Sequence, residues 1–240
     1  MTVLDSRVLI VGGGSGIGFA VARAARQEGA RITIASTDGA KLKTASDRLG
    51  AVETAILDIT DESAVSRFFL TSGAFDHVVT TAGDWGKARR GTFTEMNFAD
   101  AEALFRVRFW GAAILAKHAA QHLSAGGSIT VTGGTSAFRP RKGTVMATAM
   151  AGSVEHLTYG LAAELAPIRV NAVFPGGVAT EIFQSLPEKT RLAEEARFER
   201  QLLPRIGQPD EIAQAYLYLM KAGYTTGQII VVDGGAMLGG

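Results

Sequence analysis

The sequence has no cysteine among its 240 residues, which excludes disulfides, thiolate catalysis and cysteine-ligated metal sites. No apolar run approaches the roughly 18 residues that a membrane-spanning helix needs. The formal net charge of only +1 gives no bulk attraction to nucleic acid or to a membrane surface. No charged leader with a cleavage site precedes the first predicted strand, so no signal peptide is expected. These absences predict a cytoplasmic protein that binds neither nucleic acid nor membrane.

What is present is an alternation of short β-branched runs and helical patterns along the whole chain. Strands are predicted at 8–11, 31–35, 52–57, 77–81, 128–132, 169–174 and 228–232, and helices at 19–28, 41–49, 62–70, 99–123, 144–165 and 210–220. Such alternation is typical of α/β proteins with a doubly wound parallel sheet, here of about seven strands, and helices on both faces. With 47% hydrophobic residues the chain can form one core, so residues 1–240 are predicted to be a single domain. The polar stretch 181–205 is either a lid over the ligand pocket or an ordinary surface helix.

A glycine-rich turn follows the first predicted strand. Gly12, Gly16 and Gly18 lie between the strand at 8–11 and the helix at 19–28. Glycine lets the chain turn sharply and lets backbone N–H groups approach a ligand closely. A helix that begins at such a turn offers free N–H donors and a partial positive charge, which suits a pyrophosphate. The turn therefore predicts nucleotide binding; a tight strand-to-helix link without a ligand is the alternative.

The spacing of these glycines carries a family resemblance. Residues 11–18 resemble the T-G-x-x-x-G-x-G motif of the short-chain dehydrogenase/reductase family, with Val11 in place of threonine. Five further segments resemble family motifs in the same order: 57–60 with the aspartate that contacts adenine, 80–83 (N-N-A-G in the family), 163–176, 177–180 beside nicotinamide and pyrophosphate, and 232–235. The resemblance covers nearly the whole chain. It implies a Rossmann-type domain, an NAD(P) cofactor and an oxidoreductase acting on a carbonyl or alcohol.

The same motifs imply which residues bind the cofactor. They are Gly12, Gly14, Ser15, Gly16, Ile17, Gly18, Ser36, Thr37, Lys41, Asp58, Ile59, Thr81, Ala82, Gly83, Pro175, Gly176, Val178 and Thr180. An acidic residue at the end of the second strand would repel a 2′-phosphate, but Ser36 stands there. Thr37 occupies the position where NADP enzymes often carry arginine, and Lys41 follows. This favours NADP, and Asp38 keeps NAD as the alternative.

The family's catalytic residues do not carry over. Its Tyr-x-x-x-Lys pair falls on Ala147 and Ala151, its serine on Gly134 and its asparagine on Arg108. A carbonyl reductase needs a proton donor within about 3 Å of the developing alkoxide, and an alanine supplies none. Tyr159 lies about 18 Å further along the same predicted helix. The remaining tyrosines, at 216, 218 and 224, lie near the C-terminal end of the sequence. The sequence thus predicts an altered acid/base apparatus.

Several other side chains could act in this pocket. Thr135 and Ser136 could orient a carbonyl by hydrogen bonds, and Arg108 and Lys142 could fill the vacated space with positive charge. Arginine matches carboxylates and phosphates bidentately, so the pocket would then prefer an anionic ligand. The alternative is a solvated charged surface. It would equally account for the basic residues Lys87, Arg89, Arg90, Arg139 and Arg141.

His118 and His122 have i,i+4 spacing, but no third ligand lies nearby in the sequence, so no metal site is expected. The oxidoreductase reading competes with a non-catalytic NADP(H)-binding sensor or partner protein, and with a non-redox enzyme that uses the pocket's cations. The missing Tyr and Lys favour the sensor, whereas the complete fold resemblance favours the oxidoreductase. Family members are commonly tetramers or dimers, which implies a homo-oligomer acting on a small-molecule substrate.

Overall fold

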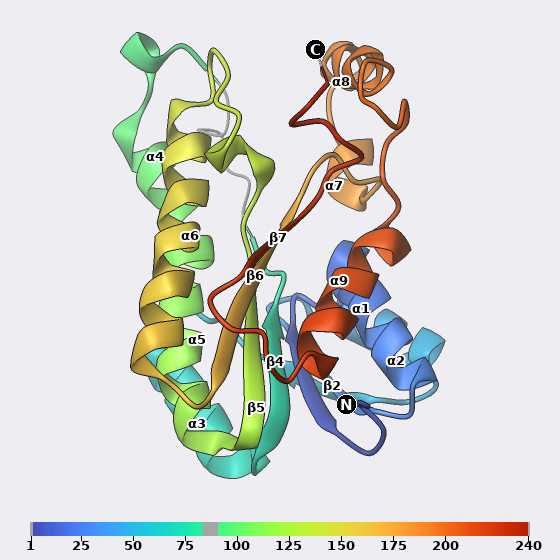
Figure 1. Ribbon diagram of the computed structural model, residues 1–240, viewed down its shortest axis with the longest axis vertical. Helices are drawn as coiled ribbons and strands as arrows, with labels where there is room; N and C mark the ends of the chain where they lie inside the picture. The colour runs from blue at the N-terminus through green and yellow to red at the C-terminus, as the bar shows by residue number, and fades with distance from the viewer. Residues whose placement is uncertain (1, 84–90, 240) are drawn as a thin grey trace.

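The computed structural model describes residues 2–83 and 91–239, so the predicted basic residues Lys87, Arg89 and Arg90 lie outside the described residues. Within these ranges seven parallel strands form one sheet in the order β3-β2-β1-β4-β5-β6-β7 (Figure 1). They are β1 (Arg7–Val11), β2 (Arg31–Ser36), β3 (Glu53–Ile56), β4 (Phe75–Thr80), β5 (Leu123–Thr132), β6 (Arg169–Pro175) and β7 (Ile229–Val232). The predicted parallel α/β sheet is confirmed.

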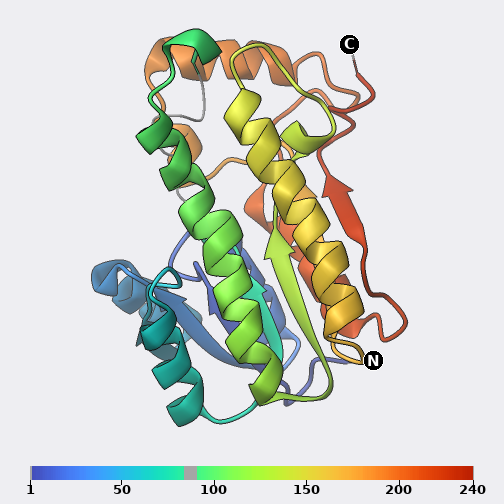
Figure 2. The ribbon, with the colours of Figure 1, turned by 90° about the vertical axis from the view of Figure 1, so that its left-hand side faces the viewer.

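Helices cover both faces of this sheet (Figures 1 and 2). One face carries α1 (Gly16–Gln27), α2 (Gly39–Leu49) and α9 (Pro209–Lys221); the other carries α3 (Glu62–Ser72), α5 (Ala112–Ala119) and α6 (Val145–Glu164). Side chains alternate along a strand, so Val8 and Ile10 of β1 enter one core cluster and Leu9 and Val11 the other. Among the described residues, no helix is both long and apolar enough to cross a membrane.

The helix predicted at 99–123 is interrupted. It consists of α4 (Phe98–Phe105), a π-helical turn (Arg106–Gly111), α5 and a short 3₁₀ turn (Ala120–His122). A π-helical turn inserts an extra residue and redirects the side chains around it, which is frequent at functional sites. Arg108 lies in this turn and is buried.

Strand β5 begins at Leu123, earlier than the predicted Ser128. Residues 124–127 are Ser, Ala, Gly and Gly, which lack the β-branched side chains that mark a strand in sequence. Leu123 nevertheless pairs with Phe75 of β4, across a register shift that separates it from the regular ladder beginning at His77 and Ser128. Strand pairing, not residue type, sets this boundary.

The polar stretch 181–205 contains two helices, α7 (Glu181–Gln184) and α8 (Glu188–Phe198). Both lie beyond the carboxyl ends of the strands, at the top of Figure 1. Phe198 anchors α8 to the segment after β6, because its ring packs against Gly177, where a Cβ would come within 2.2 Å of the ring. The segment therefore covers the end of the sheet where ligands bind in folds of this kind.

Candidate active site

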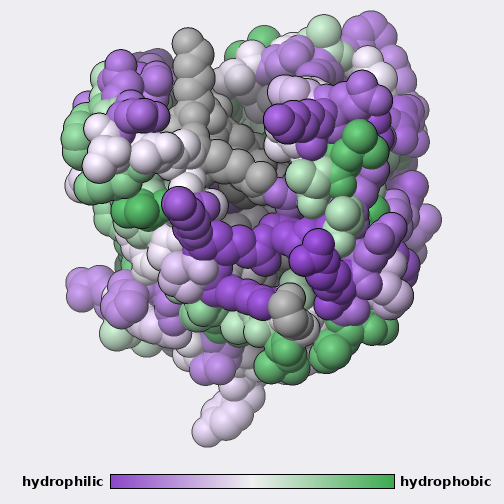
Figure 3. Space-filling view, turned by 90° about the horizontal axis from the view of Figure 1, so that it is seen from above, coloured by the Kyte–Doolittle hydropathy of each residue, from purple (hydrophilic) through white to green (hydrophobic). Residues whose placement is uncertain are grey.

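A cleft of about 910 Å³ opens at the carboxyl ends of the strands. Figure 3 views the molecule from this end, where hydrophilic side chains gather around a hollowed surface. The strand order reverses between β1 and β4, and such a switch point is where open parallel sheets bind ligands. Every residue that the sequence motifs assign to the cofactor lines this cleft.

The glycine-rich turn is shaped by contacts that no side chain would fit. Gly12 and Gly16 have positive φ angles of 85° and 52°, in the left-handed region that favours glycine. A Cβ on Gly18 would lie 2.2 Å from the Gly12 carbonyl oxygen. At the N-terminus of α1, the Ser15 side chain forms no capping hydrogen bond, and the first turn contains no acidic residue. The turn and the helix N-terminus therefore fit the pyrophosphate of a dinucleotide.

Thr81 holds this turn against the end of β4. Its backbone N–H donates to the Val11 carbonyl at 2.9 Å, and its hydroxyl lies 3.3 Å from the same oxygen and 3.4 Å from the Gly12 oxygen. A Cβ on Gly18 would come within 2.5 Å of the Thr81 hydroxyl oxygen. The ends of β1 and β4 and the start of α1 are thus fixed to one another at the switch point.

The end of β2 presents hydroxyls to the cleft and directs a carboxylate toward a helix. Ser36 and Thr37 line the cleft. The Asp38 carboxylate caps α2 by accepting the Lys41 backbone N–H at 3.0 Å, and the Asp38 N–H donates to the Ser36 hydroxyl at 3.2 Å. After β3, Asp58 accepts the Thr60 N–H at 2.8 Å, which fixes its carboxylate at the cleft wall.

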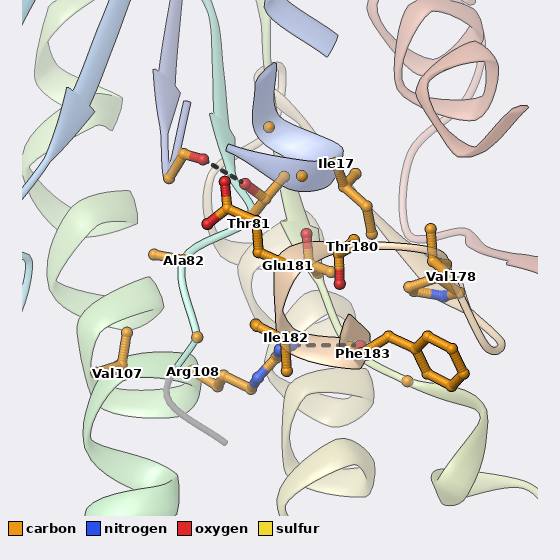
Figure 4. Close-up of a pocket in the computed structure, with 18 of the residues that line it drawn as sticks. Ile17, Thr81, Ala82, Val107, Arg108, Val178, Thr180, Glu181, Ile182 and Phe183 are labelled. Atoms are coloured by element: carbon orange, nitrogen blue, oxygen red, sulfur yellow. Dashed lines mark hydrogen bonds between the residues drawn. The ribbon is translucent and has the colours of Figure 1, made fainter. Parts of the chain in front are cut away.

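Arg108 brings a buried positive charge into the cleft. Its side chain is 5% exposed and points into the cleft in Figure 4. The Nη1 atom lies 3.5 Å from the Gly133 carbonyl oxygen, and the guanidinium lies against Gly83. A buried cation is costly unless it has compensating partners, so such residues concentrate at functional sites. Arg108 therefore lies at the cleft, and its role in binding an anion stays a prediction.

The positions aligned with the family's catalytic residues are also located. Ala147 and Gly134 line the cleft, together with Thr135 and Ser136. The Ser136 hydroxyl donates to the Ala147 carbonyl at 3.2 Å, which ties this loop to the first turn of α6. Ala151 is fully buried inside the core and does not line the cleft.

Lys142 is not brought to the site. Its side chain is exposed, and it is not among the residues that line the cleft. The loop after β5 instead turns Arg139 inward, where its guanidinium donates to the Ala236 carbonyl. Arg141 also lines the cleft, so two of the three basic residues expected after β5 lie there and Lys142 does not.

The far wall of the cleft was largely missed by sequence reasoning. It comes from α7, α8 and the residues after β7, and includes Glu181, Ile182, Phe183, Leu186, Glu194, Arg197, Phe198, Ala236 and Met237. Glu194 is 7% exposed, and its carboxylate pairs with Arg197 at 2.6 Å. The i,i+3 spacing of this pair on a predicted lid was the available signal.

Tyr216 lies beneath the cleft, in contact with the cleft-lining Thr132, although it comes late in the sequence. Its phenol lies 2.6 Å from the Thr132 hydroxyl, which itself donates to the Thr80 carbonyl and lines the cleft. Because the Thr132 proton is used by Thr80, the phenol is the donor to Thr132. Complete burial raises the pKa of Tyr216 above its usual value, so it stays protonated.

The two histidines with i,i+4 spacing have separate partners. His118 contacts the Glu62 carboxylate at 3.2 Å, and His122 stacks on Phe69 with ring centroids 5.8 Å apart. No group of three His, Cys, Asp or Glu side chains converges in the part of the chain that the structure describes.

A family model described as enoyl-(acyl carrier protein) reductase matches residues 12–237, which span the chain from the glycine-rich turn after β1 to the residues after β7. The chain belongs to the short-chain dehydrogenase/reductase family. Within that family it is 34% identical to the short-chain dehydrogenase/reductase ATR9 of Stachybotrys chlorohalonatus, over 99% of both chains.

Solved structures of this family superpose on the chain. A small-chain dehydrogenase in complex with NADPH is 36% identical, with a TM-score of 0.85 over 98% of this chain and 100% of that one. The MalC reductase/Diels-Alderase from Malbranchea aurantiaca is 30% identical, with a TM-score of 0.89 over 98% of each chain. The chain therefore has the Rossmann-type nucleotide-binding fold of these oxidoreductases.

Proposed function

We propose that this short-chain dehydrogenase/reductase uses NADP(H) to interconvert a carbonyl and an alcohol on a small anionic substrate. The observation that carries the proposal is the convergence, in one cleft, of all the motif-assigned cofactor residues and the buried Arg108.

The choice of NADP over NAD rests on the end of β2. Ser36 and Thr37 offer hydroxyls, and the Asp38 carboxylate is engaged as the N-cap of α2. An acidic residue free to bind the ribose hydroxyls would favour NAD. The NADPH complex of a 36% identical small-chain dehydrogenase is consistent with this choice. NAD is the alternative cofactor.

The proposed acid/base apparatus differs from the tyrosine–lysine pair of the family. NADP(H), when bound by the glycine-rich turn and the residues after β6, would supply or accept the hydride. Thr135 and Ser136 orient the carbonyl oxygen, and Arg108 stabilises the negative charge that develops on it. Arginine stays protonated at any working pH and Ala147 carries no proton, so the alkoxide proton comes from water in the cleft.

The anionic substrate class rests on the cations around the substrate end of the cleft. Arg108, Arg139 and Arg141 line it. Arg197 and Glu194 also line it, and their charges offset each other in an ion pair. The side chains of Ile182, Phe183 and Leu186 give the same part of the cleft an apolar surface. A compound with a carboxylate or phosphate and an apolar body matches this wall.

The alternative, a non-catalytic NADP(H)-binding sensor or partner protein, would keep the cofactor cradle and lose turnover. The comparisons do not favour it, because the relatives carry dehydrogenase and reductase names. A panel of carbonyl compounds incubated with NADPH separates the two functions. Loss of NADPH absorbance with any of them supports the oxidoreductase, whereas tight binding with no turnover supports the sensor.

Binding itself is tested by calorimetric titration with NADPH and, separately, with NADH. We expect micromolar binding of NADPH and much weaker binding of NADH. No binding of either would make the glycine turn a purely structural link and overturn the proposed function.

We further propose that residues 1–240 act as one domain with 181–205 as its lid, and that the protein is a cytoplasmic homo-oligomer. The lid is supported by the cleft-lining residues of α7 and α8. The oligomer is supported by large apolar side chains on the face of α4 to α6, where Phe98 is 66%, Trp110 59% and Tyr159 43% exposed. Sedimentation velocity measures the oligomeric state directly.

A further inference from the structure

An ion pair joins two segments that are 140 residues apart in the sequence. The Lys41 Nζ atom, in the first turn of α2, lies 2.8 Å from Oε2 of Glu181, the first residue of α7. Both residues line the cleft. The hydrogen bond and charge of Glu181 raise the pKa of Lys41 above its ordinary value.

The two partners flank the glycine-rich turn. A Cβ on Gly14 would lie 3.3 Å from the Lys41 Cβ, so the lysine stem packs against one side of the turn. A Cβ on Gly16 would lie 3.2 Å from Cγ2 of Thr180, the residue before Glu181. Figure 4 shows Thr180 and Glu181 at the start of α7. The ion pair therefore connects α2 to the lid segment, beside the glycine-rich turn that is proposed to hold the pyrophosphate.

The pair places opposite demands on one ammonium group. Lys41 follows Ser36 and Thr37, the hydroxyls proposed to face the 2′-phosphate. The 2′-phosphate and the Glu181 carboxylate are both attracted to this ammonium group and repel each other. Side chains of Lys41 and Glu181 are 50% and 60% exposed, so their pair is weak and is readily exchanged for another anion.

We propose that Glu181 is a specificity-determining residue that reduces the preference for a 2′-phosphorylated cofactor by competing for Lys41. Binding of NADP(H) exchanges the Glu181 carboxylate for the 2′-phosphate at the Lys41 ammonium and detaches the start of α7 from α2. NADH, which has no 2′-phosphate, leaves the pair in place. The inference rests on the proposed NADP(H) site and deepens it.

The test compares Glu181→Gln with wild type by calorimetric titration of NADPH, NADH and the fragments 2′,5′-ADP and AMP. The fragments isolate the 2′-phosphate from the nicotinamide end of the cleft. We expect Glu181→Gln to bind NADPH and 2′,5′-ADP about two- to fivefold more tightly and to leave NADH and AMP unchanged. The gain should shrink at high salt because the competing groups are exposed.

Two further variants assign the effect to Lys41. In the Lys41→Gln background, Glu181→Gln should give no gain. Glu188→Gln is the matched control: it removes the same charge from the first turn of the neighbouring α8, is exposed and does not line the cleft. It should leave all four affinities unchanged. Thermal melts of each variant confirm that the fold is intact.

The outcomes separate this inference from the proposed function. Unchanged NADPH affinity in Glu181→Gln, or equal tightening of NADPH and NADH, overturns the competition while wild-type NADPH binding keeps the proposed function standing. Failure of wild type to bind either cofactor overturns both.

Discussion

The guanidinium of Arg108 lies directly over Gly83, so closely that a Cβ on Gly83 would come within 2.4 Å of Arg108 Nη2. Arg108 comes from the π-helical turn before α5, and Gly83 follows β4. The absence of a side chain at Gly83 thus lets a buried cation lie against the backbone at the switch point of the sheet. Two residues from separate motifs build one feature of the site.

This contact predicts that Arg108 and Gly83 variants share a phenotype. Arg108→Ala should raise KM for an anionic carbonyl substrate by roughly 10- to 100-fold, the usual loss of a charge-assisted hydrogen bond. It should also lower kcat, because Arg108 is proposed to stabilise the charge that develops on the carbonyl oxygen. Gly83→Ala should raise KM in the same direction, because its methyl group displaces the guanidinium. Steady-state kinetics with NADPH at saturation measure both.

The matched control is Lys43→Ala, which removes a positive charge from the exposed face of α2 outside this cleft, where Lys43 pairs with Asp47 at 2.9 Å. It should leave KM within a factor of about two, since exposed pairs contribute little. A substrate that loses no affinity in Arg108→Ala would show that this arginine does not bind the anion.

Replacing glycine by alanine should have opposite effects on stability at two positions, one in the glycine-rich turn and one in α6. Gly18→Ala should destabilise the protein by about 2 kcal/mol or more and abolish NADPH binding, because its methyl group would lie 2.2 Å from the rigid Gly12 carbonyl. Gly160→Ala lies within α6, where a Cβ meets no atom within 4 Å. It should raise the free energy of unfolding by about 0.5–1 kcal/mol. Thermal unfolding and NADPH titration of the pair check both results.

These glycines also show how far sequence reasoning extends. The glycine-rich turn, the parallel sheet and the residues assigned to the cofactor could be predicted, because each belongs to a short segment in which a strand, a turn and a helix are adjacent in sequence. Local chemistry decides such segments, so their spacing alone predicts Gly12, Gly16 and Gly18 at one site.

The far wall of the cleft, formed by α7, α8 and the residues after β7, could not be predicted in the same way. Glu194, Arg197 and Met237 line the cleft only because α8 and the residues after β7 pack back over the sheet. The direction of Arg108 depends on a π-helical turn, and that of Lys142 on the path of a loop. Tertiary packing decides these positions; the i,i+3 spacing of Glu194 and Arg197 indicates an ion pair but does not place it at the cleft.

Tyr216 predicts a stability effect without a catalytic one. Its phenol donates to Thr132 from a fully buried position on α9 and does not line the cleft. Tyr216→Phe should lower the free energy of unfolding by about 1 kcal/mol, the usual value of one neutral hydrogen bond. The pH profile of turnover should not move, because the pKa of Tyr216 is raised and the phenol stays protonated. A shifted pH profile would instead make Tyr216 the missing proton source.

His77 predicts how stability depends on pH. Its imidazole is buried between β4 and β5, where Nδ1 lies 2.8 Å from the Ser128 hydroxyl. Burial, and then the positive charge of Arg169, lower the pKa of His77 to about 4 from the ordinary 6.5. The unfolded chain therefore takes up a proton at a higher pH than the folded chain does. Stability is fully present above pH 6.5 and is lost as the pH falls toward 4.

The loss expected over this interval is roughly 2–3 kcal/mol. Urea denaturation of wild type and His77→Gln at pH 7 and pH 4.5 measures it. Glutamine keeps a polar group near Ser128 but does not titrate, so the variant should be less stable at pH 7 and lose less stability on acidification. His118, His122 and His156 are the same in both proteins. The difference between the two proteins in the stability lost from pH 7 to pH 4.5 therefore isolates the contribution of His77. An equal loss of stability in the two proteins would show that His77 has the same pKa in the folded and unfolded chains. Burial of this imidazole would then not set the acid sensitivity of the fold.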